Sequence, residues 1–362
     1  MSTFGEAIKI SLFGESHGEA IGITIHNFPH GIKIDFQQIE EYLMRRRPKD
    51  NLSTSRVEND EYKVISGVFD GYTTGAPLTF IITNNNTNSS CYEKDNIRPS
   101  HADLTAYQKY NGYNDYRGGG HFSGRITAPL MILGSLCDQL LKIKGTVIFS
   151  HIYNIKNIYS TSLLNNNSLS EVSKKLINSD FPVIDEITLK QMKKEIAEAA
   201  ANKDSVGGSI ETIVLNPPLS IGEPFFDSVE SLISHLIFSI PSVKGVEFGK
   251  GFDITNELGN IANDQIYMEN GFIKTYSNNS GGINGGITNG MPIVFKTAIK
   301  PTPSISHEQQ TISIRTMDNT SIKTKGRHDP CIVQRALPVI NALTSYAIVE
   351  LLYRIEGNIW IK

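Results

Sequence analysis

Short runs of alternating or continuous apolar residues recur along the chain, separated by turns rich in Gly, Pro and Asn. Such runs are typical of β-strands, because successive side chains of a strand point to opposite faces of a sheet and turn residues end the strand. The pattern predicts seven strands, over residues 8–13, 21–26, 63–69, 78–83, 145–150, 210–215 and 293–299.

Apolar positions spaced three and four residues apart predict helices between these strands. The clearest helix runs from Asp35 to Pro48, where Asp35 with Gln38 three residues later resembles a capping box and Pro48 ends the helix. Further helices are predicted over 129–142, 185–203 and 332–354, the last with a kink at Pro338.

Strands and helices alternate without the regular rhythm of a doubly wound parallel sheet. We therefore predict an α+β layered architecture with largely antiparallel sheets. Because no linker and no repeat of fixed period interrupts the chain, residues 1–362 are expected to form one large unit. Residues 152–180, rich in Asn, Ser and Lys, are expected to be a surface elaboration.

Composition narrows the classes of function. The chain is 39% hydrophobic and 20% charged with a net charge of −3, so it has no overall attraction for nucleic acid or membrane. No run of about 20 apolar residues predicts a membrane span, and no signal peptide is recognisable at the start. Cys91, Cys137 and Cys331 are odd in number and far apart, which argues against disulfides or structural zinc and fits a reducing cytoplasm.

Candidate chemistry begins with the turn FGESHGEAIG, residues 13–22, which places His17 between two apolar strands. A side chain on such a turn is positioned by a rigid scaffold, as binding and catalytic groups often are. The alternative is a plain hairpin with a solvated histidine.

Arginines are concentrated in one part of the chain. Arg45, Arg46 and Arg47 end the first helix, and seven of the eleven arginines lie between residues 45 and 125. Guanidinium groups match carboxylate and phosphate oxygens in a bidentate way, so the cluster indicates an anion site. A solvated helix end is the alternative for the first three.

Residues 116–128 form a glycine-rich stretch that leads into a predicted helix, which is typical of an anion cradle, although it lacks the Gly-Lys-Ser/Thr of a Walker loop. His101 lies in a charged loop in which Asp103 either orients the imidazole or caps a helix. Asp329 lies just before the last helix and can be a base, a helix cap or an ion-pair partner. Residues 281–286 match a dinucleotide fingerprint only weakly, because a strand rather than a helix follows.

Nine motifs in order make a resemblance apparent: FGESHG, RRRP, RPSHAD, RGGGHFSGR, DSVGG, VKGVEFGKGF, GGINGG, KPTPS and GRHDPC. From about residue 4 to 350 the chain resembles the chorismate synthase family. The resemblance implies a β-α-β sandwich, a homotetramer, and the 1,4-anti elimination of phosphate from 5-enolpyruvylshikimate 3-phosphate to give chorismate. It also implies reduced FMN as cofactor, without net oxidation or reduction.

The resemblance also implies residue roles. His17 would protonate the departing phosphate, His101 would stand near flavin N1, and Asp329 would act through flavin N5 to remove the ring hydrogen. The substrate's anions would be bound by Ser16, Arg46, Arg47, Arg125 and Arg327. Flavin would be bound by His121, Phe122, Ser123, Pro241, Ser242, Gly285, Lys300, Pro301, Thr302, Pro303, Ser304 and Arg327.

Two positions depart from the family pattern. His121 begins a motif that commonly starts with arginine, and Asn341 replaces a glutamate in the last helix. The chain is too short to carry the reductase activity of some family members, so it is expected to depend on an external, NADP-linked source of reduced flavin.

The same residues are compatible with three other functions. The chain can be a flavin- or phosphate-binding regulator with decayed chemistry, or its arginines can form an RNA-binding face. As a third reading, His17, His101 and His121 can be metal ligands of a hydrolase. The resemblance itself calls for no metal.

Overall fold

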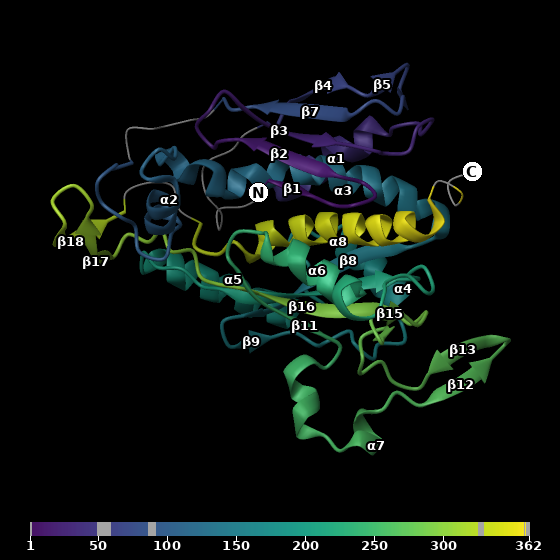
Figure 1. Ribbon diagram of the computed structural model, residues 1–362. Helices are drawn as coiled ribbons and strands as arrows, with labels where there is room; N and C mark the ends of the chain where they lie inside the picture. Colours follow the sequence, from purple (N-terminus) through teal and green to yellow (C-terminus); the bar gives the residue numbers. More distant parts are fainter. Residues whose placement is uncertain (1, 49–58, 86–91, 325–328, 358, 360–362) are drawn as a thin grey trace.

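Two antiparallel five-stranded sheets enclose a layer of helices in the computed structural model, which describes residues 2–48, 59–85, 92–324, 329–357 and 359 (Figure 1). The first sheet has the order β1 (Thr3–Phe4), β2 (Ile10–Gly14), β3 (Ala20–Ile25), β7 (Leu78–Thr83), β4 (Tyr62–Ser66). The second has the order β11 (Val243–Phe248), β16 (Ile293–Ile299), β10 (Gly208–Leu215), β8 (Val147–Ile155), β9 (Ile158–Tyr159). This is the predicted α+β architecture with antiparallel sheets.

The helices between the sheets are α1 (Phe36–Arg46), α3 (Ala128–Leu141) and α8 (Val333–Glu356), with α6 (Val229–Phe238) packed beside α8 and β11. Their side chains join one continuous core with the inner faces of both sheets. In β3, for example, Ile21, Ile23 and Ile25 alternate toward the helices and are fully buried. The predicted strands and helices are therefore confirmed, with 63–69 divided between β4 and β5 (Val68–Phe69).

Local signals explain where two helices begin. The Asp35 carboxylate accepts a hydrogen bond from the Gln38 backbone N–H at 3.0 Å, which satisfies an amide that the first turn of α1 leaves unpaired. Asp185 does the same for Thr188 at the start of α5 (Glu186–Ala201). The N-cap read from the sequence is thus a real contact, but the second half of the capping box is not, because the Asp35 backbone N–H donates to Gln139 Oε1 at 2.9 Å and not to Gln38.

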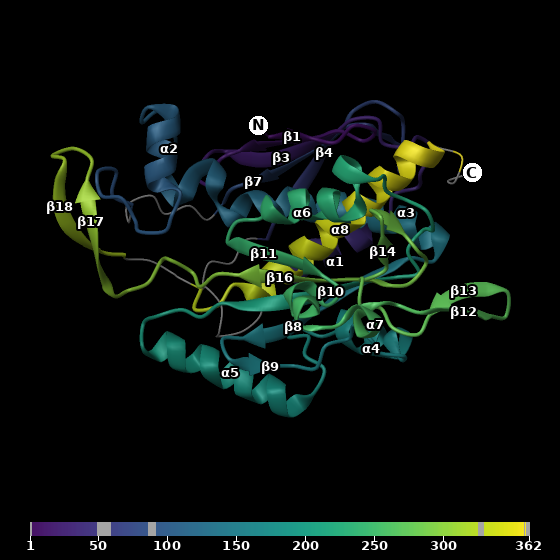
Figure 2. The ribbon, with the colours of Figure 1, turned by 60° about the horizontal axis from the view of Figure 1, so that its bottom comes forward.

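Smaller elements surround the sandwich. They are β6 (Tyr72–Thr73), α2 (Asp103–Tyr110), α4 (Leu169–Ile177), α7 (Gly259–Ala262), β14 (Ile283–Asn284) with β15 (Ile287–Thr288), and β17 (Glu308–Ser313) with β18 (Asp318–Lys323). The hairpin of β12 (Ile266–Glu269) and β13 (Phe272–Thr275) projects away from the sandwich in both views (Figures 1 and 2).

The prediction that residues 152–180 form a surface elaboration is wrong in two respects. The first residues of this segment belong to β8, a strand inside the second sheet, where Ile152 and Ile155 are fully buried. Further on, Leu163, Leu169 and Leu176 cover the outer face of that sheet and form a second apolar cluster. The polar composition of the segment conceals these three buried leucines.

Two helical segments, Arg117–Lys144 and Val333–Glu356, are long and apolar enough to cross a membrane, although the sequence pattern suggested none. Their most apolar windows are 78% and 89% buried inside the protein. Their apolar character is explained by their place between two sheets, because a helix covered on all sides is apolar all round.

Cys137 and Cys331, on or beside these helices, are free thiols, and burial raises the pKa of Cys331 to about 12. Cys91 lies outside the described residues.

Helices α3 and α8 pack closely where Gly134 faces Ala342. A Cβ added at Gly134 would lie 2.3 Å from the Ala342 Cβ and 2.5 Å from its Cα, well inside van der Waals contact. No side chain larger than hydrogen fits there unless the helices separate.

Gly134→Ala is therefore expected to lower the free energy of unfolding by about 1–3 kcal/mol, as overpacked cores do. This loss outweighs the helix propensity of alanine, which favours the variant by up to about 1 kcal/mol. Urea unfolding followed by circular dichroism measures the change. Gly259→Ala is the control, because an added Cβ in α7 meets no atom within 4 Å. A Gly134→Ala protein as stable as wild type would contradict the close α3–α8 contact.

Candidate active site

A cavity of about 1010 Å³ lies at one end of the helical layer, where α8 begins and where α1 and α6 end. Its walls come from the β2–β3 turn, the glycine-rich segment, the loop before α2, the α6–β11 connection, the loop after β16 and the start of α8. Segments from the whole length of the chain therefore meet at this cavity.

Most of the predicted site residues line this cavity. They are His17, Arg46, Arg47, His101, His121, Phe122, Ser123, Arg125, Pro241, Ser242, Lys300, Thr302, Pro303, Ser304 and Asp329. Ser16 lies behind His17 and is fully buried, and Pro301 does not line the cavity. Arg327 lies outside the described residues.

Gly285 is not brought together with the other predicted cofactor residues. It lies in the turn of the β14–β15 hairpin, where Gly286 O accepts the Val229 N–H at the start of α6, whereas the cavity meets the other end of that helix. Gly285 and Gly286 have φ of 61° and 87°, so the turn itself requires glycine. The glycine pattern here has a local structural cause.

The His17 turn is held rigidly, which contradicts the alternative of a solvated histidine. His17 is 8% exposed, and its ring packs edge-on against Tyr92 with centroids 5.3 Å apart. The Ser16 N–H donates to Gly120 O at 3.1 Å, which ties the turn to the glycine-rich segment. A Cβ at Gly118 would lie 2.4 Å from His17 Cδ2, so only glycine lets that segment pass the ring.

The arginines converge on one buried carboxylate that the sequence did not single out. Arg125 Nη1 donates to Asp60 Oδ1, while Arg46 Nη2 and Arg47 Nε lie 3.6 and 3.9 Å from Asp60 Oδ2. The Asp60 side chain is only 1% exposed. This carboxylate therefore holds three guanidinium groups together at the cavity wall, and no motif around residue 60 gave a signal for it.

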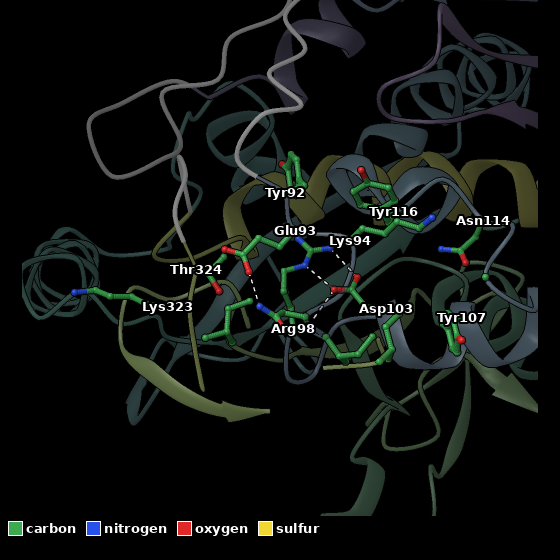
Figure 3. A pocket seen from close by; sticks show the side chains of 15 residues that line it. Tyr92, Glu93, Lys94, Arg98, Asp103, Tyr107, Asn114, Tyr116, Lys323 and Thr324 are labelled. Atoms are coloured by element: carbon green, nitrogen blue, oxygen red, sulfur yellow. Dashed lines mark hydrogen bonds and ion pairs between the residues drawn. The ribbon is translucent and has the colours of Figure 1, made fainter. Parts of the chain in front are cut away.

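Asp103 fixes the loop that carries His101 through its bonds to Arg98, and it is not the N-cap of α2. Its carboxylate accepts from the Arg98 backbone N–H at 3.1 Å and from Nε and Nη2 at 2.7 and 2.8 Å (Figure 3). Ala102, without a side-chain bond, occupies the N-cap of α2. His101 Nε2 lies 2.6 Å from Ser304 Oγ, in the loop after β16. The pair in Figure 3 borders a separate small cavity of about 60 Å³.

Asp329 is an ion-pair partner and not a helix cap. Arg335 Nη1 donates to Asp329 Oδ2 at 2.6 Å, and Arg335 Nε donates to Arg46 O at 3.3 Å. The N-cap of α8 is Ile332, which has no side-chain bond. Arg335, in the first turn of α8, thus connects Asp329 with the end of α1.

The glycine-rich segment does lead into a helix, as predicted. Gly118, Gly119 and Gly120 all have positive φ, and two short 3₁₀ turns then join α3. His121 is bonded on both ring nitrogens, Nδ1 to Gly14 O at 3.2 Å and Nε2 to Ser2 Oγ at 2.9 Å. The histidine that replaces the usual arginine is therefore a tether between the segment and the first sheet.

The loop after β16 supplies further polar groups for an anionic ligand. Burial and the nearby Lys244 lower the pKa of Lys300, whose Nζ donates to Ser100 O at 2.7 Å. Thr302 Oγ1 is buried with no partner among the described residues. Ligand pockets measure roughly 300–1000 Å³, so this cavity lies at the upper end of the range for small-molecule sites. Within the described ranges, no group of three or more His, Cys, Asp and Glu side chains is arranged to hold a metal ion.

Fold and cavity together define an enzyme-like β-α-β sandwich with an arginine-lined cavity of the size of a small-molecule site. A family model described as chorismate synthase matches residues 8–353. Chorismate synthase of Dehalococcoides mccartyi is 41% identical over 356 residues, which cover 98% of this chain and 97% of that protein. Chorismate synthase of Pyrococcus abyssi is 41% identical over 354 residues, with 97% of each chain covered.

A solved structure agrees with these relatives. A chain described as "Crystal Structure of Chorismate Synthase" superposes with a TM-score of 0.77 at 25% identity, covering 98% of this chain and 94% of that one. The chain belongs to the chorismate synthase family.

The Arg98–Asp103 pair gives the site a testable dependence on pH. Burial alone would raise the pKa of Asp103, but the bonds from Arg98 outweigh it and lower the pKa below the ordinary 3.8. A depressed carboxyl pKa contributes stability that is fully present above the unfolded-state value and is lost as pH falls through the folded-state value.

Asp103→Asn is therefore expected to lower the free energy of unfolding at pH 7 by about 1–3 kcal/mol, the usual loss for hydrogen bonds to charged groups. The difference from wild type should shrink below pH 3.8. Urea unfolding between pH 7 and 3 measures both effects. Asp115→Asn is the control, because its partner Arg117 is 42% exposed and an exposed pair contributes less than about 1 kcal/mol. Equal losses in the two variants at pH 7 would refute this account.

Proposed function

We propose that this protein is a chorismate synthase, a carbon–oxygen lyase of the shikimate pathway that leads to aromatic amino acids. It removes phosphate and a ring hydrogen from 5-enolpyruvylshikimate 3-phosphate by a 1,4-anti elimination, giving chorismate. The observation that carries the proposal is the single cavity that His17, Asp329 and the arginine cluster share. The relatives at about 40% identity over nearly the whole chain support it.

Substrate binding falls to the arginines. Arg46, Arg47 and Arg125 would hold the phosphate and the two carboxylates, since planar guanidinium groups bind such anions with paired hydrogen bonds. The Ser16 hydroxyl, buried and without a described partner, lies beside the His17 ring and Gly118 and supports a place near the phosphate. Arg327 is assigned to the same anions by its motif.

His17 would donate a proton to the departing phosphate, because an alkyl phosphate leaves more readily when its oxygen is protonated. Its near-complete burial and the edge-on Tyr92 ring keep the imidazole in one orientation. Asp329, held by Arg335, would be the group toward which the ring hydrogen departs as a proton.

Reduced FMN, when bound, would supply electron density to the substrate ring as phosphate leaves and recover it as the ring hydrogen leaves. His101, in contact with Ser304, would hold the proton near flavin N1. Residues His121–Ser123, Pro241, Ser242 and Lys300–Ser304 would position the flavin. The contribution of the chain is orientation and electrostatics.

The remaining assignments follow from the family. The protein would act in the cytoplasm, receive reduced flavin from an external NADP-linked reductant and need neither metal nor nucleic acid. The regulator with decayed chemistry is not favoured, because His17, His101 and Asp329 are all present at the cavity.

Phosphate release from 5-enolpyruvylshikimate 3-phosphate under anaerobic conditions tests the proposal. We expect release only with chemically reduced FMN, and kcat lowered about 10²–10⁴-fold in His17→Ala and in Asp329→Asn, the usual contribution of acid–base groups. His30→Ala, at an exposed histidine, is the control and should retain wild-type kcat. A folded wild-type protein that binds FMN but releases no phosphate would refute the enzyme and favour the regulator.

We also propose that the chain forms a homotetramer. The segment that follows β11 carries apolar side chains that are each at least 59% exposed: Phe252, Leu258, Ile261, Ile266, Met268, Phe272, Ile273 and Tyr276. A two-stranded hairpin such as β12–β13 is marginally stable by itself in water, and exposed apolar surface of this kind supports association.

Light scattering coupled to size-exclusion chromatography should give a mass four times that of the 40.0 kDa chain. The same mass at successive dilutions would distinguish a stable assembly from aggregation. A mass of one chain at every concentration would contradict the tetramer.

A further inference from the structure

One amide side chain connects the His17 turn with the arginine cluster. Asn84 follows β7 and does not itself line the cavity. Its Nδ2 donates to Glu15 O at 3.0 Å and to Gly18 O at 2.9 Å, the two carbonyls that flank Ser16 and His17. Its Oδ1 accepts from Arg125 Nε at 3.0 Å.

The chemistry of the partners fixes the orientation of this amide. Both N–H bonds point to carbonyl oxygens, which only accept, and the oxygen points to a guanidinium N–H, which only donates. The backbone N–H of Asn84 also donates to Glu19 O at 3.0 Å, at the other end of the turn. Both N–H groups and the oxygen of the amide therefore have partners, and flipping the amide would break all three side-chain hydrogen bonds.

We propose that Asn84 is a positioning residue that sets the place of His17 relative to Arg125. The inference rests on the proposed function, in which Arg125 holds an anion of the substrate and His17 protonates the departing phosphate. The guanidinium of Arg125 is anchored on its other side by Asp60, so a shift of the turn against Asn84 moves His17 and leaves Arg125 in place.

The reaction is sensitive to this spacing. A proton donor acts only within hydrogen-bond reach of its acceptor, and a misplacement of about 1 Å can lower a rate about 10²-fold. Asn84 contacts neither the cavity nor the reacting atoms, so its effect has to pass through His17 and Arg125.

Two substitutions separate the effect that passes through His17 from the effect that passes through Arg125. Asn84→Ala removes all three side-chain bonds, so we expect kcat to fall about 10–100-fold and KM for the substrate to rise. Asn84→Asp keeps an oxygen toward Arg125 Nε but turns the other oxygen against the carbonyls of Glu15 and Gly18. We expect kcat to fall as in Asn84→Ala, whereas KM rises further than in Asn84→Ala, because the added carboxylate opposes the substrate anion that Arg125 binds.

The experiment measures kcat and KM by anaerobic phosphate release with reduced FMN, and Tm, for both variants in the wild-type and His17→Ala backgrounds. In the His17→Ala background Asn84→Ala should lower kcat less than about threefold, because the group it positions is gone. Asn178→Ala is the control: this exposed amide also donates to one backbone carbonyl, Lys174 O, on the outer face of the other sheet.

Each outcome is decisive. A fall in kcat in both Asn84 variants, with a higher KM in Asn84→Asp than in Asn84→Ala and loss of the kcat effect in the His17→Ala background, supports the inference. An effect no larger than that of Asn178→Ala, or an equal fall in kcat in both backgrounds, overturns it while wild type remains active. If wild type itself releases no phosphate, the proposed function fails and this inference fails with it. If Asn84→Ala does not fold, Asn84→Asp, which has nearly the same shape, still shows whether the fall in kcat depends on His17.

Discussion

The close contact of α3 and α8 at Gly134 and Ala342 is the constraint from which the site follows. It lets two long apolar helices fill the space between the two sheets, and it fixes the offset between their ends. The start of α8 then lies beside the glycine-rich approach to α3 and the end of α1. A cavity at that end of the layer is a consequence of how the helices pack.

Buried polar groups fix the first sheet against this layer. Glu350, fully buried in α8, accepts from the backbone N–H groups of Glu6, Ala7 and Ile8 at 2.7, 3.0 and 2.7 Å. The Tyr346 hydroxyl donates to Ile8 O at 2.6 Å. An unpaired carboxylate there would be costly, so these bonds hold the segment before β2 in one register. Because β2 leads from this segment to the His17 turn, the same register also fixes the position of that turn.

Much of the fold could be predicted because its signals are local. The alternation of Ile21, Ile23 and Ile25 and the caps Asp35 and Asp185 each depend on residues within a few positions. What failed depends on partners that the sequence does not pair. Asp103 has the chemistry of a cap or of an orienting group, and only the folded loop shows that Arg98 takes its carboxylate.

The same limit applies to the site. Motifs indicated His17, Asp329 and the arginines, whereas Asp60 and Asn84 act through contacts to Arg125 across 65 and 41 residues. Gly285 shows a different limit, since the hairpin turn itself requires glycine there and the sequence does not place that turn relative to the cavity. Sequence motifs identify the groups that touch ligand more readily than those that position them.

The central claim is that one cavity brings substrate anions, a proton donor and flavin together. A crystal structure of the protein with oxidised FMN and 5-enolpyruvylshikimate 3-phosphate tests it most directly. We expect the substrate phosphate against Arg125 and within hydrogen-bond reach of His17, with the flavin ring between the substrate and the wall formed by Lys300–Ser304. Either ligand bound outside this cavity, or the phosphate directed away from His17, would contradict it.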